Sequence, residues 1–110
     1  MLDRPDRPGN YREASASGMF VYALTKAVHR GWLDRAVYEK VASRGYQGLW
    51  REFVEIDAGG QVNVKNVCKV AGLGGSPYRD GSYAYYTSTE VVKNDPKGVG
   101  ALLLAAAESE

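Results

Sequence analysis

Residues 14–31 have the sequence ASASGMFVYALTKAVHRG, and this stretch predicts the first helix of the chain. Its apolar residues at helical spacing are Phe20, Leu24, Ala27 and Val28. We expect Ser15 or Ser17 to cap the start, because a hydroxyl group can accept a hydrogen bond from a free backbone N–H there. Gly31 follows a basic last turn, which is typical of a helix end. The helix is therefore expected over about residues 14–30.

A second helix is predicted over about residues 35–55, with Asp34 as its cap. Its apolar stripe is formed by Tyr38, Val41, Ala42, Leu49, Phe53 and Ile56. Gly45 and Gly48 lie inside it, and each costs about 1 kcal/mol relative to alanine in an exposed helix. Two such glycines suggest that a neighbouring element approaches closely. Since only a short turn separates the two helices, they should form an antiparallel hairpin.

A small β element and a long loop are expected next. Residues 57–60 predict a turn, and residues 61–64 alternate polar and apolar, which predicts a short strand paired with residues 67–70. Residues 71–93 are rich in glycine and tyrosine and predict a long loop without regular structure. Loops of this length are uncommon in compact domains and often carry function.

A third helix is predicted over about residues 96–108, with Asp95 as cap and Pro96 at its first position. The run Val99–Ala107 is almost entirely apolar and is expected to be largely buried. A helix that is apolar on most sides needs neighbours on most sides, and this chain offers few. We therefore expect residues 1–110 to form a single, mainly α unit that belongs to something larger.

The composition excludes several classes of protein. The chain has 110 residues, of which 45% are hydrophobic and 25% charged, with a net charge of +1. That balance excludes a disordered chain and gives no basic footprint for nucleic acid. The sequence has no apolar run long enough to span a membrane, and its first eight residues lack the apolar segment of a signal peptide. The single cysteine, Cys68, cannot form an internal disulfide, so the chain fits a reducing, cytoplasmic compartment. Cys68 is expected to be a buried thiol.

The long loop holds most of the residues that could bind a ligand. Gly74 and Gly75 could let backbone amides approach it, and Tyr78 offers a flat ring suited to a sugar face or to ordinary packing. Arg79 could bind a carboxylate ligand or form a salt bridge within the loop, where Asp80 is its neighbour.

Outside the loop, Glu13 is either a helix-start carboxylate favoured by the helix dipole or a residue of the cleft. The acids Glu13, Asp80 and Asp95 are candidates for two-carboxylate chemistry, but the sequence places no two of them together. His29 has no partner at a metal-ligand spacing, so no metal site is expected.

Several blocks of sequence resemble one family. They are residues 10–24 (NYREASASGMFVYAL), 46–49 (YQGL), 67–75 (VCKVAGLGG), 78–83 (YRDGSY) and 94–100 (NDPKGVG). In order and spacing they resemble the C-terminal part of the unsaturated rhamnogalacturonyl hydrolases, glycoside hydrolase family 105. That family is related to the unsaturated glucuronyl hydrolases of family 88. The resemblance covers nearly the whole chain, from about Gly9 to Glu108.

The resemblance implies the C-terminal helical hairpins of an (α/α)6 toroid, with a small β-ribbon and a glycine- and tyrosine-rich loop. It also implies hydration of the C4–C5 double bond of an unsaturated galacturonyl residue on a pectin oligosaccharide, without metal or organic cofactor. The catalytic aspartate of the family is expected upstream of this chain, so the chain alone should be inactive. The positions carried over as substrate-binding are Tyr11, Glu13, Gly74, Gly75, Tyr78, Arg79 and Asp80.

Two other hypotheses compete with this one. The tyrosine-rich loop could make the chain a non-catalytic carbohydrate-binding module. Alternatively, the chain could be a degenerate fragment that self-associates through exposed helix faces. In each case neither nucleic acid nor a membrane is expected as a partner.

Overall fold

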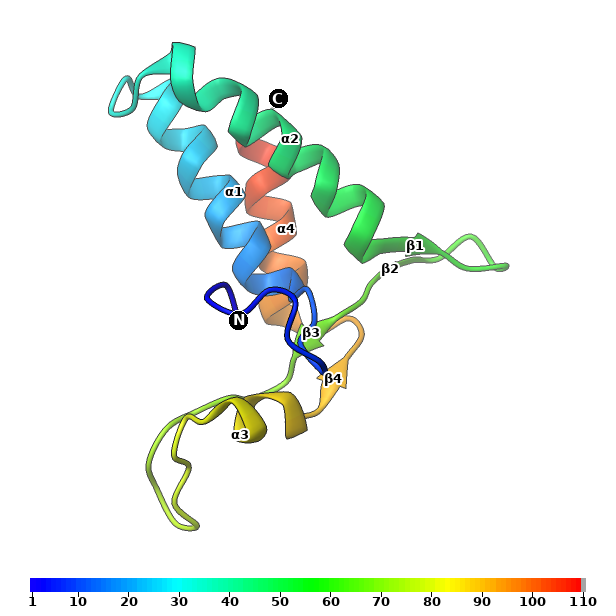
Figure 1. Ribbon diagram of the computed structural model, residues 1–110. Helices are drawn as coiled ribbons and strands as arrows, with labels where there is room; N and C mark the ends of the chain where they lie inside the picture. The colour runs from blue at the N-terminus through cyan, green and yellow to red at the C-terminus, as the bar shows by residue number, and fades with distance from the viewer. Residues whose placement is uncertain (110) are drawn as a thin grey trace.

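The structure, a computed structural model, describes residues 1–109. Three long helices lie side by side: α1 (Ala14–His29), α2 (Arg35–Phe53) and α4 (Pro96–Ser109) (Figure 1). Helix α1 is central, since it packs against both α2 and α4, whereas α2 and α4 touch much less. The small β elements and the long loop extend from the end of the molecule at which α1 begins (Figure 1).

Helix α1 confirms the first predicted helix but differs at its start and on its buried face. Its cap is Glu13, whose side chain accepts from the backbone of Ser15 and Ala16, so the expected serine caps are wrong. The buried face consists of Ala14, Ser15, Gly18, Val21, Thr25 and Val28. Phe20, expected in the stripe, is 56% exposed. The reason is that small residues face α4, where a Cβ on Gly18 would lie only 2.9 Å from the Cβ of Ala101.

Helix α2 begins as predicted, with the Asp34 carboxylate accepting from the backbone of Ala36 at 2.9 Å. It ends at Phe53 instead of residue 55, because Val54–Ile56 form strand β1. The close approach expected at its glycines is confirmed for Gly45, where a Cβ would lie 2.8 Å from Val21. It is wrong for Gly48, which has no neighbour within 4 Å of such an atom.

The predicted strand pairing is also wrong. Strand β2 (Val62–Val64) pairs antiparallel with β1, and Asp57 accepts from two backbone N–H groups in the turn between them. Strand β3 (Val67–Cys68) pairs with β4 (Val91–Val92), from the far side of the loop. The positive φ of 60° at Asn66 turns the chain between β2 and β3 and takes them into separate ribbons.

The loop expected over residues 71–93 contains regular structure that the sequence did not reveal. Its second half forms the short helix α3 (Tyr83–Ser88), capped by Ser82, followed by β4. The first half has one isolated bridge, between Gly74 and Arg79. The loop is therefore a projecting turn that returns through a helix (Figure 1).

Helix α4 confirms the third predicted helix and its start, because the Asp95 carboxylate accepts from the backbone of Lys97 at 2.9 Å. The expectation that Val99–Ala107 would be largely buried is only partly right. Ala101, Leu102 and Ala105 are buried against α1, but Leu103 and Leu104 are 65% and 53% exposed. The core lies where the three helices meet the ribbons, and it consists of Ala14, Val21, Leu49, Phe53, Val64, Val67, Leu102 and Ala105.

Candidate functional site

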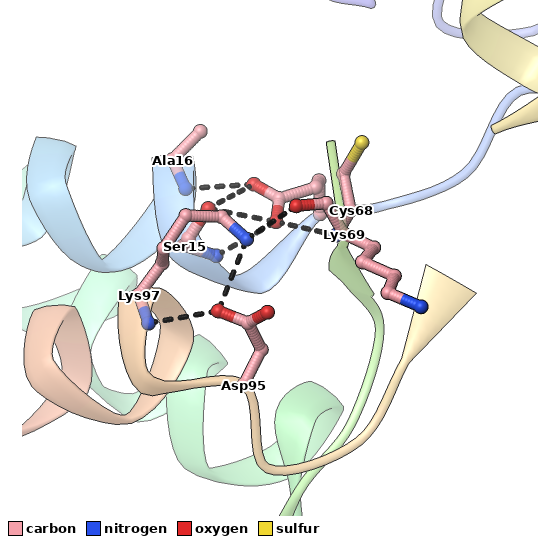
Figure 2. A network of polar contacts seen from close by, with 7 residues as sticks. Ser15, Ala16, Cys68, Lys69, Asp95 and Lys97 are labelled. Carbon is pink, nitrogen blue, oxygen red and sulfur yellow. Dashed lines mark hydrogen bonds and ion pairs between the residues drawn. The ribbon is translucent and has the colours of Figure 1, made fainter. Parts of the chain in front are cut away.

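Glu13 joins the start of α1 to strand β3. Figure 2 shows one carboxylate with the backbone of Ser15, Ala16 and Cys68 around it, and the hydrogen bonds identify this carboxylate as that of Glu13. Its Oε1 accepts from the backbone N–H groups of Ser15 (3.1 Å) and Cys68 (3.0 Å), and its Oε2 accepts from that of Ala16 (2.7 Å). The Ser15 hydroxyl donates as well. Both carboxylate oxygens are thus engaged within the protein, and the expectation of a helix-start carboxylate is confirmed.

A second link at the same end joins α4 to Lys69, the residue that follows β3. The Lys97 ammonium donates to the backbone carbonyl of Lys69 at 2.8 Å and to the carboxylate of Asp95 at 3.0 Å (Figure 2). Lys69, in turn, pairs with Glu90 on the returning side of the loop. The place where the long loop leaves the helical body is therefore fixed by both α1 and α4.

Tyr11 lies beside the second half of the loop. Its ring stacks on that of Tyr86 in α3, with centroids 5.4 Å apart and planes 3° from parallel. The Tyr11 hydroxyl is buried and has no hydrogen-bond partner within residues 1–109. Burial raises the pKa of Tyr11 and of Tyr86 above the ordinary value of 10.0, so both rings stay neutral.

Arg79 shapes the projecting turn. Its backbone exchanges two hydrogen bonds with Gly74, and its guanidinium Nε donates to the carbonyl of Gly74 at 2.8 Å. A Cβ on Gly72 or Gly75 would lie 2.8 and 2.9 Å from guanidinium nitrogens, so the side chain rests on bare backbone. The expected salt bridge within the loop is wrong, because the side-chain partners of Arg79 among residues 1–109 are the carbonyl groups of Leu73 and Gly74. The binding of a carboxylate ligand by Arg79 stays a prediction.

Two apolar side chains of the projecting turn are exposed to solvent. Tyr78 is 79% exposed and Leu73 is 72% exposed. Asp80 is exposed as well, and its carboxylate accepts a hydrogen bond from the backbone N–H of Ser82 at 2.8 Å, which lowers the pKa of the carboxyl group. At the base of the loop, the Tyr83 hydroxyl donates to the carbonyl groups of Arg7 and Pro8, each at 3.0 Å.

The seven predicted site residues fall into two groups. Tyr11 and Glu13 lie at the start of α1 and line a cleft of about 770 Å³ between the N-terminal segment, α1 and α2. The other five belong to the projecting turn and do not line that cleft: Gly74, Gly75, Tyr78, Arg79 and Asp80. Tyr86 lines the cleft and is the link between the two groups through its stack on Tyr11. The sequence showed Tyr86 only as one of several tyrosines in the long loop. The fold distinguishes it from the others, because its ring stacks on Tyr11.

Among the described residues, every carboxyl group with a shifted pKa has a lowered pKa, which favours its ionised form. The pKa of Glu52 is lowered by Arg51 and Arg12, and that of Glu55 by Lys93. Backbone N–H groups lower the pKa values of Asp57, Asp80 and Asp95. A general acid needs the opposite, a carboxyl group whose pKa is raised toward the working pH.

Residues 1–109 hold no group of three or more His, Cys, Asp or Glu side chains placed to bind a metal ion. His29 instead lies 3.3 Å from Glu108, at the far end of α1. Among these residues no helix combines the length and the apolar character needed to cross a bilayer.

Comparisons with known proteins agree with this arrangement. The family model of Glycosyl Hydrolase Family 88 matches residues 1–110. Protein Atu3128 of Agrobacterium fabrum and the 24.9 kDa protein in the picA locus of Rhizobium radiobacter are each 42% identical over 114 residues. Those alignments cover 99% of this chain and 49% of each relative, so the chain spans about half their length.

Solved structures show the same fold. A family 105 glycoside hydrolase of C. acetobutylicum ATCC 824 superposes with a TM-score of 0.94 and 48% identity, over 98% of this chain and 30% of that one. A possible member of family 105 from Salmonella enterica superposes with a TM-score of 0.72 and 24% identity, over 94% and 24% of the two chains. The predicted fold, mainly α with hairpins of an (α/α)6 toroid, is confirmed. Since the family model covers all of its residues, the chain belongs to glycosyl hydrolase family 88.

Proposed function

We propose that this glycoside hydrolase chain takes part in removing unsaturated galacturonate from rhamnogalacturonan oligosaccharides. The observation that carries the proposal is the 48% identity to a family 105 glycoside hydrolase across 98% of the chain. The reaction would be hydration of the C4–C5 double bond. A general acid protonates this enol ether, water adds, and the resulting hemiketal opens and releases the neighbouring sugar.

The general acid of this reaction would lie outside these residues. Protonation of an enol ether requires a carboxyl group that still holds its proton near the working pH. The shifted carboxyl groups here are displaced in the other direction, as Glu52 and Asp95 illustrate. Glu13 has both oxygens occupied by donors from α1 and β3. We therefore infer that the chain supplies part of the substrate cleft and not the acid.

Some residues of this chain would contact the sugar, and others would hold the loop that carries them in place. Tyr78 and Leu73, which stand free at the tip of the turn, would contact the sugar, because exposed apolar rings and methyl groups fit sugar faces. Arg79 and the glycines beneath it would hold that tip in shape. Glu13 and Tyr11 would hold the base of the loop against α1.

The alternative of a free-standing carbohydrate-binding module has less support. Such a module needs several accessible rings, yet Tyr83 is bonded to the N-terminal segment and Tyr86 is stacked on Tyr11. Of the loop tyrosines, only Tyr78 stands largely exposed within the described residues. Saturation-transfer NMR of the isolated chain with unsaturated rhamnogalacturonan disaccharide would test it, and no transfer at millimolar sugar would argue against this alternative.

A chimera tests the proposal directly. Residues 1–110 would replace the aligned segment of the clostridial family 105 protein, with the parental protein as control. We expect the chimera to consume unsaturated rhamnogalacturonan disaccharide, seen as loss of ultraviolet absorbance of the double bond. A chimera that folds, as judged by circular dichroism, but leaves that substrate untouched while the parent consumes it would contradict the proposal.

A further inference from the structure

The side chain of Tyr83 lies against the N-terminal segment, residues 1–11. Its hydroxyl group donates to the backbone carbonyl groups of Arg7 and Pro8, each at 3.0 Å. The guanidinium group of Arg7 also lies over the ring, with its central carbon 3.9 Å from the ring centroid. A cation at that distance over an aromatic ring is attracted to it. The ring and the hydroxyl group of Tyr83 therefore both contact the same segment.

The N-terminal segment has an internal structure that places the acceptor for Tyr83. The side-chain amide of Asn10 donates to the carbonyl group of Arg4 at 2.8 Å. The backbone N–H of Asn10 donates to the carbonyl group of Arg7 at 3.0 Å. A carbonyl oxygen has two lone pairs, so that of Arg7 can accept from Asn10 and from Tyr83 together. Asn10 thus holds this carbonyl group where the hydroxyl group of Tyr83 meets it.

Tyr86 makes a second contact with the segment from the same face of α3. Residues three apart in a helix lie on one face, and Tyr86 stands three residues after Tyr83. Its ring stacks on that of Tyr11 at the end of the segment, with centroids 5.4 Å apart. Tyr85 lies between them in the sequence, and its hydrogen bonds within residues 1–109 are those of its backbone. Two of the three tyrosines of α3 thus face the N-terminal segment.

Helix α3 depends on such contacts for its position. Its six residues are too few to form a stable helix by themselves. None of them belongs to the hydrophobic core of the described chain. The helix is also the returning side of the projecting turn, since only Gly81 and Ser82 separate Asp80 from Tyr83. A shift of α3 would therefore move the tip of the turn, where Tyr78 stands.

We propose that the N-terminal segment fixes the position of the projecting turn, and that Tyr83 is the positioning residue through which it acts. The contacts at Tyr83 and Tyr86 lie one helical turn apart, so together they prevent α3 from pivoting about either one. The consequence for the sugar rests on the proposed function, in which Tyr78 contacts it. Since the tip takes no part in proton transfer there, its position should govern how tightly the substrate binds and not how fast it reacts.

Amide hydrogen exchange of the whole chain, followed by NMR, tests this role. Tyr83→Phe keeps the ring beneath Arg7 and removes only the hydroxyl group. The backbone N–H of Tyr86, which donates to the carbonyl group of Ser82 at 3.0 Å, should then exchange up to about tenfold faster. Tyr85→Phe makes the same chemical change in the same helix and should leave that rate unchanged. Exchange in α1 and α4 should stay constant in both variants, whereas a general loss of stability would raise it there too.

Two substitutions of Arg7 test the ring contact separately, because neither alters the backbone carbonyl group. Arg7→Met removes the cation and should speed exchange of the Tyr86 N–H by about threefold. Arg7→Lys keeps a cation over the ring and should restore most of the wild-type rate. Equal Tyr86 rates in Tyr83→Phe and Tyr85→Phe would overturn the proposal. If Tyr83→Phe does not fold, equal rates in Arg7→Met and the wild type would overturn it instead.

Kinetics of the chimera with the clostridial family 105 protein test the consequence for the sugar. Tyr83→Phe should raise KM for unsaturated rhamnogalacturonan disaccharide about two- to fivefold, because the turn then spends part of its time out of the binding position. The value of kcat should not change, whereas a partly unfolded enzyme would lose kcat at constant KM. An active chimera whose KM is the same with and without Tyr83→Phe would overturn the positioning role. A chimera inactive in every form would contradict the proposed function alone, since hydrogen exchange still decides the role of Tyr83.

Discussion

At the scale of single residues, Glu13 connects elements that are distant in the sequence. Its carboxylate accepts from two backbone N–H groups in the first turn of α1 and from that of Cys68 in β3. Bonds of this kind to a charged acceptor are worth more than neutral ones, and losing the acceptor leaves the donors unpaired. Glu13 thus provides the link from α1 to the strand at which the loop begins, beside the link that Lys97 makes from α4.

Replacing Glu13 with alanine should lower the free energy of unfolding by about 2–3 kcal/mol, since a cap and a bond to β3 are lost together. Urea unfolding followed by circular dichroism measures the change. Glu39→Ala is the control, because Glu39 forms only an exposed pair with Arg35 and its loss should cost about 0.5 kcal/mol or less. Equal losses of unfolding free energy in the two variants would show that Glu13 does not link α1 to β3.

Arg79 holds the projecting turn by hydrogen bonds to backbone carbonyl groups. Arg79→Lys keeps the charge but not the planar group that rests on Gly72 and Gly75, so the turn should open more often. Limited proteolysis with chymotrypsin should then cleave after Tyr78 several times faster than in the wild type. Arg44→Lys, at an exposed position of α2, should leave the rate unchanged, and an unchanged rate in both would refute the role of Arg79.

At the scale of elements, the contact between α1 and α4 depends on the absence of a side chain. A Cβ on Gly18 would lie 2.9 Å from the Cβ of Ala101 and 3.0 Å from its backbone carbon. Backbone cannot move aside as a flexible side chain can, so the helices would have to separate. Gly48 in α2 is the opposite case, with open space where the Cβ would be.

Gly18→Ala and Gly48→Ala should therefore change stability in opposite directions. The first should destabilise the chain by about 1–3 kcal/mol through overpacking, despite the better helix propensity of alanine. The second should stabilise it by about 0.5–1 kcal/mol, because alanine restricts the unfolded chain and nothing opposes it in the fold. Thermal unfolding of both variants against the wild type measures the signs, and two changes of the same sign would contradict this packing.

The elements that the sequence predicted well are those with local signals. Asp34 marks a helix start, and so do Asp95 and Pro96, because caps act on N–H groups a few residues away. The pairing of β3 was missed because Val67 pairs with Val92, across the whole loop. The exposure of Phe20 was missed for a similar reason, since the buried face of α1 depends on where α4 lies. The same holds for Arg79, whose residue type favours a charged partner although its partners are carbonyl groups.

At the scale of the whole molecule, the lowered carboxyl pKa values set the response to acid. A carboxyl group with a lower pKa in the folded chain stabilises the fold above its ordinary value, and this contribution is lost as the pH falls through the folded value. Glu52, Glu55, Asp57, Asp80 and Asp95 all shift in this direction, from ordinary values of 4.5 and 3.8. The melting temperature should be level near neutral pH and fall below about pH 4.5.

Asp57→Asn tests one part of this acid response. The carboxylate of Asp57 accepts from the backbone of Gly59 and Gln61, and these bonds favour its ionised form. The variant should melt at a lower temperature at neutral pH, and its curve against pH should be flatter in acid. Gln61→Ala keeps the backbone donor and should retain the wild-type slope. An Asp57→Asn curve parallel to that of the wild type would rule out this contribution.

We propose that this family 88 chain forms part of an unsaturated-uronide hydrolase and that its residues 1–109 do not supply the general acid. The most direct measurement is the ultraviolet absorbance of unsaturated rhamnogalacturonan disaccharide incubated with the purified chain of 110 residues. We expect no loss of absorbance beyond that of the buffer control, at any pH at which the chain stays folded. Steady turnover that follows the chain through purification would contradict it, because one of the carboxyl groups described here would then have to be the acid.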